Sequence, residues 1–183
     1  MKSLFVRRLF RILNQTFMVP VFRLGLGPLI VNPFTGYILV LKTTGHKTGK
    51  TRFTPVNYAL WQGNIYCLAG AGKVAHWYRN LMANPLLEVL LPGRAVSAAA
   101  QEVENRVEKA QVVRQIYKNG GFVGFLMGLN PYTASDEKLL SSVAGVPVIR
   151  LRPNGLGSGP SDAGGWLWLP VLVGMIVVIV RLF

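Results

Sequence analysis

The 183-residue chain is long enough for one folded domain with additional segments, and 51% of it is hydrophobic. Its 20 Lys and Arg against 7 Asp and Glu give a formal net charge of +13, which permits binding to anionic lipid or nucleic acid. The single cysteine, Cys67, excludes an intrachain disulfide framework, and the two histidines, His46 and His76, show no metal-ligand spacing, so no metal site is expected.

Residues 1–24 carry five cations and no acid, and they are predicted to form a basic amphipathic helix. The arginines gather on one side of this helix. The opposite side holds Phe5, Leu9, Ile12, Leu13, Thr16 and Phe17. Such a helix can lie on anionic lipid, or it can cap the core of the domain with its charges in solvent. The apolar tail described below favours the lipid-facing interpretation.

Residues 25–153 are predicted to form a small antiparallel barrel of α+β class, because several short strands follow one another through hairpin turns. A tight turn at Gln62-Gly63-Asn64 supports one of these hairpins. Residues 121–145 have no clear pattern. The predicted strands are 37–41, 52–60, 65–69, 86–91, 95–103 and 146–151, and the predicted helices are 76–82 and 103–117.

The C-terminal part differs in composition from the rest of the chain. Residues 154–165 are rich in Gly and Ser and are predicted to be a flexible linker. Residues 166–183 contain fifteen residues without a charge before Arg181, and they are predicted to form a hydrophobic helix. A helix of this length is marginal for crossing a bilayer. A membrane anchor is favoured over a buried core helix, because the segment is apolar on all sides and follows a linker.

The segment Thr43–Arg52, which lies between two predicted strands, has the composition of an anion-binding loop. It contains two glycines, four hydroxyl side chains and three cations, and it has no acid. Glycines allow backbone amides to approach a ligand, and Lys and Arg pair with phosphate or carboxylate. The spacing from Gly45 to Gly49 does not fit a Walker A loop. The alternative for such a loop on its own is a solvated basic turn.

Two motifs together resemble a known family. The first is Thr43-Thr44-Gly45-His46-Lys47-Thr48-Gly49 with Arg52 and Pro55, and the second is Trp77-Tyr78-Arg79-Asn80-Leu81-Met82-Ala83-Asn84-Pro85. The sequence resembles the deazaflavin-dependent nitroreductases and quinone reductases, which use coenzyme F-420. The resemblance covers about residues 35–153. It implies a split β-barrel, an antiparallel barrel of the FMN-binding kind with a few helices, with the hydrophobic tail outside it.

The resemblance also implies which residues bind the cofactor. Lys47 and Arg52, with the amides around Thr48 and Gly49, would hold its phosphodiester and acidic tail. Trp77 and Asn80 would lie beside the deazaflavin ring. His46 stands where relatives often have Arg, and His76 where some have Met. The complete implied set is Thr44, Gly45, His46, Lys47, Thr48, Gly49, Lys50, Arg52, Pro55, His76, Trp77 and Asn80. No catalytic residue is identified, and Tyr117 and Tyr132 are the only candidates.

The function implied is hydride transfer from reduced F-420 to a hydrophobic acceptor such as a quinone or a nitro compound. The cofactor carries the chemistry, so the absence of a catalytic triad or carboxylate pair is no objection. The expected partners are this acceptor and membrane lipid, with a homodimer left open and no nucleic acid expected. The expected location is the membrane, with the domain on the cytoplasmic side. Two alternatives remain: a barrel that binds FMN or another flavin-like ligand, and a non-catalytic basic protein that binds lipid or nucleic acid.

Overall fold

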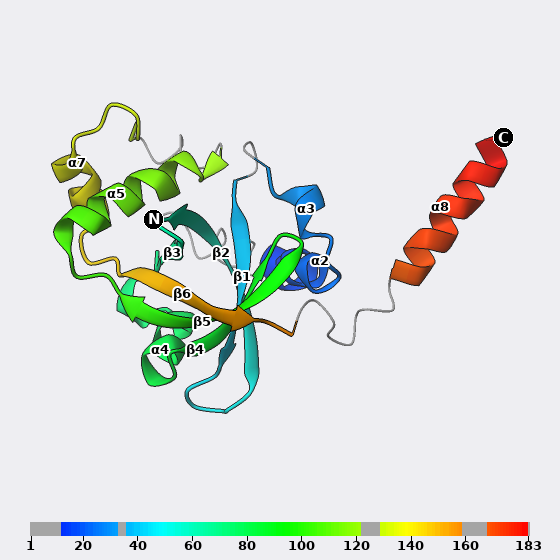
Figure 1. Cartoon of the computed structure of the whole chain (residues 1–183), viewed down its shortest axis with the longest axis horizontal. Helices are drawn as coiled ribbons and strands as arrows, with labels where there is room; N and C mark the ends of the chain where they lie inside the picture. Colours follow the sequence, from blue (N-terminus) through cyan, green and yellow to red (C-terminus); the bar gives the residue numbers. More distant parts are fainter. Residues whose placement is uncertain (1–11, 33–35, 122–128, 159–167, 183) are drawn as a thin grey trace.

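The structure, a computed structural model, describes residues 12–32, 36–121, 129–158 and 168–182. Six antiparallel strands form a closed barrel in the order β1-β2-β3-β6-β5-β4 (Figure 1). The strands are β1 (Ile38–Thr44), β2 (Thr51–Trp61), β3 (Asn64–Leu68), β4 (Leu86–Leu91), β5 (Arg94–Glu102) and β6 (Val148–Leu156). The predicted α+β barrel is therefore confirmed, and all six predicted strands are present.

Helices lie around the barrel and between its strands. The described helical elements are η1 (Asn14–Met18), α2 (Val19–Arg23), α3 (Gly27–Ile30), η2 (Gly72–Val74), α4 (His76–Ala83), α5 (Arg106–Lys118), α7 (Asp136–Ser142) and α8 (Trp168–Leu182). Asn105 begins α5 by accepting a 2.9 Å hydrogen bond from the Glu108 amide, and Ser135 caps α7 in the same way. Helix α7 lies within the stretch that the sequence left ambiguous.

Strand β1 is buried on both faces, which explains its continuous apolar sequence. Leu39 and Leu41 point into the barrel, where they pack in a cluster with Ile65, Val89 and Leu151. Val40 belongs to a different cluster on the outside, with Val19 and Phe22 of α2. The N-terminal helical segment thus covers the outer face of β1 and β4, as Figure 1 shows.

Helices α5 and α7 cover a second outer face of the barrel, at β2 and β3. Val113 of α5 and Leu139 of α7 are buried there against Tyr66 of β3. Helix α4 supplies Trp77, Tyr78 and Leu81 to the cluster inside the barrel. Burial raises the pKa of the Cys67 thiol, so this cysteine is a small apolar core residue.

The two ends of the chain differ from the predicted segments. Strand β6 continues to Leu156 and pairs with β5 at Ser97↔Gly155 and Val96↔Leu156, so it takes the first three residues of the predicted linker. Of the predicted N-terminal helix, residues 1–11 lie outside the described part. From residue 12 on, the segment is helical but includes a π-helical turn at η1.

A hydrophobic C-terminal helix is present as α8, but it has only 15 residues. Among the described residues, no helix is both long enough and apolar enough to cross a membrane. The prediction that residues 166–183 form a spanning helix is therefore not supported, since fifteen residues extend only about 22 Å against a hydrocarbon core of about 30 Å.

Candidate functional site

The predicted anion-binding loop connects β1 to β2, whose last paired residues are Thr44 and Thr51. Its backbone is closed by internal hydrogen bonds. The Gly45 amide donates to the Lys50 carbonyl at 2.9 Å. The Gly45 carbonyl accepts from the amides of Thr48 at 3.2 Å and Gly49 at 2.8 Å. These two amides were expected to hold the cofactor's phosphodiester. Because both amides already donate within the loop, its cationic side chains are the stronger groups for binding an anion.

Gly45 is required by the packing of this loop. A Cβ at this position would lie 3.0 Å from Thr48 Oγ1 and 3.1 Å from the Lys50 carbonyl oxygen. Gly49 has φ +64°, in the left-handed region that favours glycine. Both glycines of the motif therefore serve the shape of the loop, which holds Lys47 and Lys50 on a short turn next to Arg52 at the start of β2.

The cations of the loop carry no structural ion pair. Lys47, Lys50 and Arg52 are exposed, and none of them is within 4.0 Å of a carboxylate in the described part of the chain. The ion pairs found there involve other cations, namely Lys42–Glu88, Arg114–Asp136 and Arg150–Glu108. A group of cations without carboxylate partners, on a loop closed by its own hydrogen bonds, is the arrangement expected of a site for phosphate or carboxylate.

Asn80 joins the two sequence motifs. It lies on α4 and is 4% exposed. Its Oδ1 accepts a hydrogen bond from the His46 amide at 3.0 Å and lies 2.8 Å from His46 Nδ1. Its Nδ2 donates to Thr43 Oγ1 at 3.2 Å. The oxygen of Asn80 and one N–H of its amide group thus hold the loop against α4. The expected contact of Asn80 with the deazaflavin ring stays a prediction.

Trp77 is also buried, in the cluster inside the barrel. His76, by contrast, is exposed at the start of α4, and Pro55 is half-buried in β2 opposite Val40. The predicted set therefore contains two groups. The first is exposed, on the loop, and includes its cations. The second, with Trp77, Asn80 and Pro55, supports the loop or the core from behind, and exposed His76 belongs to neither group.

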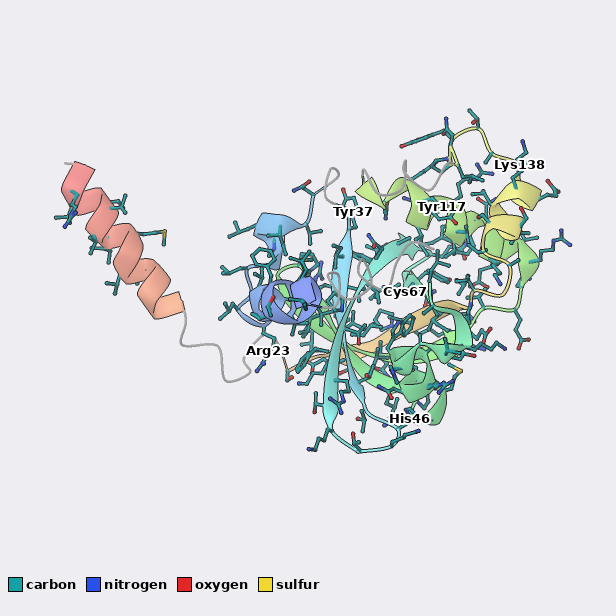
Figure 2. The ribbon with its side chains drawn as sticks, turned by 180° about the vertical axis from the view of Figure 1, so that it is seen from behind. Arg23, Tyr37, His46, Cys67, Tyr117 and Lys138 are labelled. Atoms are coloured by element: carbon teal, nitrogen blue, oxygen red, sulfur yellow. The ribbon has the colours of Figure 1, made fainter. Side chains whose placement is uncertain are left out.

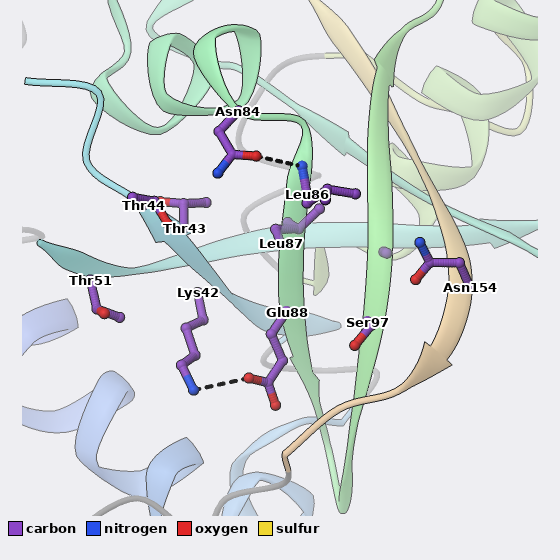
Figure 3. A pocket seen from close by; sticks show the side chains of 11 residues that line it. Lys42, Thr43, Thr44, Thr51, Asn84, Leu86, Leu87, Glu88, Ser97 and Asn154 are labelled. Carbon is purple, nitrogen blue, oxygen red and sulfur yellow. Dashed lines mark hydrogen bonds and ion pairs between the residues drawn. The ribbon is translucent and has the colours of Figure 1, made fainter. Parts of the chain in front are cut away.

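A pocket of about 470 Å³ opens beside the loop (Figure 3). Thr44 and Thr51, which flank the loop, form one side of it, and Asn84 lies at another. Lys42 Nζ and Glu88 Oε2 form an ion pair of 2.9 Å on its wall. The complete lining is Lys42, Thr43, Thr44, Thr51, Asn84, Leu86, Leu87, Glu88, Ser97, Ala98 and Asn154.

Of these lining residues, Thr44 is the one that belongs to the implied cofactor-binding set. Thr43, Thr51 and Asn84 lie in the two sequence segments already singled out, but the remaining lining residues share no local motif with them. The pairing of β1 with β4, of β4 with β5 and of β5 with β6 brings these residues together. The sequence signal that could have found some of them is the alternation of side chains between the two faces of a strand. Lys42 and Thr44, two residues apart on β1, lie on the same face of the strand.

The two tyrosine candidates lie elsewhere. Tyr117 is buried in the cluster under α5 and α7, where its hydroxyl lies 3.0 Å from Ser142 Oγ. Figure 2 shows Tyr117 far from His46, at the opposite end of the barrel. Tyr132 is 66% exposed, with Lys118 Nζ 4.9 Å from its ring centroid. Neither residue lines the pocket, so the structure does not bring them to the site.

The fold and the site define an antiparallel-barrel protein with a place for an anionic small molecule. Residues 21–121, which are 101 of the 183 residues, match the family described as F-420H(2)-dependent quinone reductase. The chain belongs to this family. The resemblance that the two motifs carry is thereby confirmed.

Solved structures are similar to this fold at low sequence identity. One is a putative 5-nitroimidazole antibiotic resistance protein from Bacteroides thetaiotaomicron, with a TM-score of 0.50, 13% identity, and coverage of 72% of this chain and 78% of that chain. A second is described as an F-420-H2-dependent reductase, with a TM-score of 0.42, 22% identity, and coverage of 63% and 93%. The first supports the barrel fold.

Membership of the family establishes the class of activity. The protein is an F-420-dependent reductase, and its cofactor is coenzyme F-420. The residues present fit this group, because an anionic cofactor needs uncompensated cations and the described loop provides Lys47, Lys50 and Arg52.

Proposed function

We propose that this reductase transfers hydride from reduced F-420 to a hydrophobic two-electron acceptor, a quinone or a nitro compound, at the pocket beside the basic loop. The observation that carries this proposal is the position of exposed, unpaired cations directly next to an open pocket. When bound, the cofactor supplies the hydride. The protein supplies binding, orientation and partial exclusion of water.

Each part of the site has a role in this proposal. Lys47 and Arg52 would hold the phosphate-bearing chain of the cofactor, since Arg presents a planar fork and Lys a compact charge. The pocket, at about 470 Å³, lies in the range of small-molecule sites, roughly 300–1,000 Å³. Leu86, Leu87 and Ala98 give it apolar wall surface, which suits a flat apolar acceptor.

Titration of the purified full chain with F-420 and separately with FMN, followed by cofactor fluorescence, tests the cofactor half of the proposal. We expect saturable binding of F-420 and much weaker binding of FMN. Anaerobic oxidation of reduced F-420 in the presence of a quinone or a nitro compound then tests the acceptor. Equal binding of both cofactors, or no oxidation with either acceptor, would contradict the proposed function.

We also propose that the protein acts at a lipid surface on the cytoplasmic side. Ile12, Leu13 and Phe17 are each about half exposed, and apolar side chains of α8 from Leu172 to Val180 are exposed as well. Exposed apolar side chains of this kind are suited to a lipid surface, and the cations at residues 1–24 of the sequence suit an anionic one. Sedimentation with anionic and with zwitterionic vesicles tests it, and equal recovery in the supernatant with both would contradict it. Protease protection in intact cells tests on which side of the membrane the domain lies.

A further inference from the structure

The contact between Asn80 and His46 determines which nitrogen of the imidazole carries a proton. A backbone N–H can only donate, so the Asn80 atom that faces the His46 amide at 3.0 Å must be the oxygen. The same oxygen lies 2.8 Å from His46 Nδ1, and an amide oxygen can only accept. Nδ1 of His46 must therefore be protonated, and the proton that can come and go is the one on Nε2.

We infer that Nε2 of His46 is a proton-linked contact for the phosphate or carboxylate groups of the ligand, and that Asn80 is the positioning residue that prepares it. The identity of the ligand rests on the proposed function; the anion contact itself does not. His46 is exposed on the same short loop as Lys47, whereas Asn80 is buried behind it.

The surrounding charges explain why this contact takes up a proton. The other titratable groups on the loop are Lys47, Lys50 and Arg52, and those on α4 are His76, Tyr78 and Arg79. Neither element contains a carboxylate. The carboxylates on neighbouring strands have other partners, since Glu88 pairs with Lys42 and Glu102 accepts from the Tyr78 hydroxyl. An anion bound beside the ring would favour the charged imidazole over the neutral one.

Protonation requires no rearrangement in this geometry. The Nδ1–H···Oδ1 hydrogen bond is the same in the neutral and the charged ring, and only Nε2 changes from an acceptor to a donor. The loop therefore carries two permanent ligand contacts, Lys47 and Arg52, and one that becomes cationic as an anion binds. An arginine at position 46 would bind the anion without this proton uptake.

The first measurement is nitrogen-15 NMR of the ligand-free full chain above neutral pH. The chain has only two histidines, so His46→Gln and His76→Gln identify the resonances. We expect the Nδ1–H tautomer to predominate for His46 in the wild type. Predominance of the Nε2–H tautomer would overturn the inference. Either variant alone is enough to assign the two histidines, so the test stands if one of them does not fold.

The second measurement is the protonation midpoint of His46 with and without sulfate, a divalent anion that does not itself titrate in this range, at ionic strength matched with chloride. We expect sulfate to raise the midpoint by about one pH unit, which corresponds to roughly tenfold tighter anion binding to the charged ring. His76 is the control and should move far less. An unchanged His46 midpoint would overturn the inference.

F-420 titrations between pH 5.5 and 8 separate this inference from the proposed function. We expect wild-type affinity to rise toward low pH and His46→Gln to lose this dependence. If sulfate raises the midpoint but F-420 does not bind, the anion contact is supported and the proposed function fails. If F-420 binds with pH-independent affinity and sulfate has no effect, binding of the cofactor is supported and the anion contact at His46 fails.

Discussion

The Ser158 hydroxyl oxygen lies 2.7 Å from Oε1 and 2.8 Å from Oε2 of Glu88, which fastens the end of the last barrel strand to the wall of the pocket. Burial opposes ionisation of Glu88, but hydrogen bonds from Lys42 and Ser158 outweigh it and lower the pKa of this carboxyl. The lowered pKa of Glu88 stabilises the folded protein at pH values above the ordinary pKa of a Glu. This contribution is lost as pH falls through the lowered pKa of the folded state. This contribution is therefore present at neutral pH and is lost in acid.

Because Ser158 is held against Glu88, we expect that position 157 requires glycine. A Cβ on Gly157 would lie 2.7 Å from Glu88 Oε1 and 2.9 Å from the Ala95 backbone carbon, so Gly157→Ala must displace the strand or the carboxylate. We expect a loss of about 1–3 kcal/mol in the free energy of unfolding, measured with urea. Gly155→Ala is the matched control, since its nearest contact would be Ser97 Cβ at 3.9 Å. Equal effects of the two changes would contradict this account.

Two truncations should differ in stability for the same reason. A chain that ends after Ser158 keeps the whole of β6, and we expect its unfolding free energy to stay within about 0.5 kcal/mol of the full chain. A chain that ends after Pro153 loses the bonds of Ser97 Oγ to the Leu156 carbonyl, of the Gly157 amide to Ala95, and of Ser158 to Glu88. At about 0.5–1.5 kcal/mol for each bond, we expect a loss of roughly 2–4 kcal/mol. Thermal unfolding of the two would measure the difference, and identical midpoints would contradict the prediction.

The barrel could be predicted from the sequence because its signals are local. The turn at Gln62 and Gly63 has φ values of +48° and +73°, which agree with a hairpin, and the apolar run of β1 follows from its burial on two faces. The end of β6 could not be predicted. Asn154, Gly155 and Leu156 have a loop-like composition, and they are a strand because β5 offers an unpaired edge.

The site was predictable only where one loop carries it. The composition of residues 43–52 predicts a cluster of cations, and these cations are exposed in the structure. The role of Asn80 was not predictable, because its partners lie more than thirty residues earlier in the chain. Likewise, Lys42 and Glu88 look like ordinary strand residues until the barrel closes and pairs their strands.

Tyr78 provides a test at alkaline pH. A 2.7 Å hydrogen bond from its hydroxyl to Glu102 Oε2, together with burial, raises the pKa of Tyr78 to about 12, above the ordinary 10.0. A pKa raised in the folded state stabilises the protein below pH 10.0, and this contribution is lost as pH rises through about 12. We expect Tyr78→Phe to remove one tyrosinate signal near pH 12 from the absorbance titration, and to cost about 0.5–1.5 kcal/mol at neutral pH. Loss of a tyrosinate signal near the ordinary pKa of 10.0 would contradict this prediction.

The last prediction concerns the cations that we propose bind the cofactor. Lys47→Ala and Arg52→Ala should each weaken F-420 binding far more than they weaken folding, because neither residue forms an ion pair in the described structure. Charge-assisted contacts with phosphate contribute roughly 1.5–3 kcal/mol each, so the dissociation constant should rise about 10- to 150-fold. Cofactor fluorescence titrations of folded, monodisperse variants would measure this.

Graded substitutions distinguish a specific contact from general attraction by the net charge. Arg52→Lys should recover part of the affinity, because the charge returns without the planar fork. Lys50→Ala should matter less than Lys47→Ala. Lys138→Ala removes an equal charge from α7, which lies far from His46 (Figure 2), and it should leave affinity nearly unchanged. Salt should weaken binding in the wild type, as expected for exposed charges. If Lys47→Ala and Arg52→Ala both bind F-420 as the wild type does, the basic loop is a solvated turn and the cofactor is held elsewhere on the barrel.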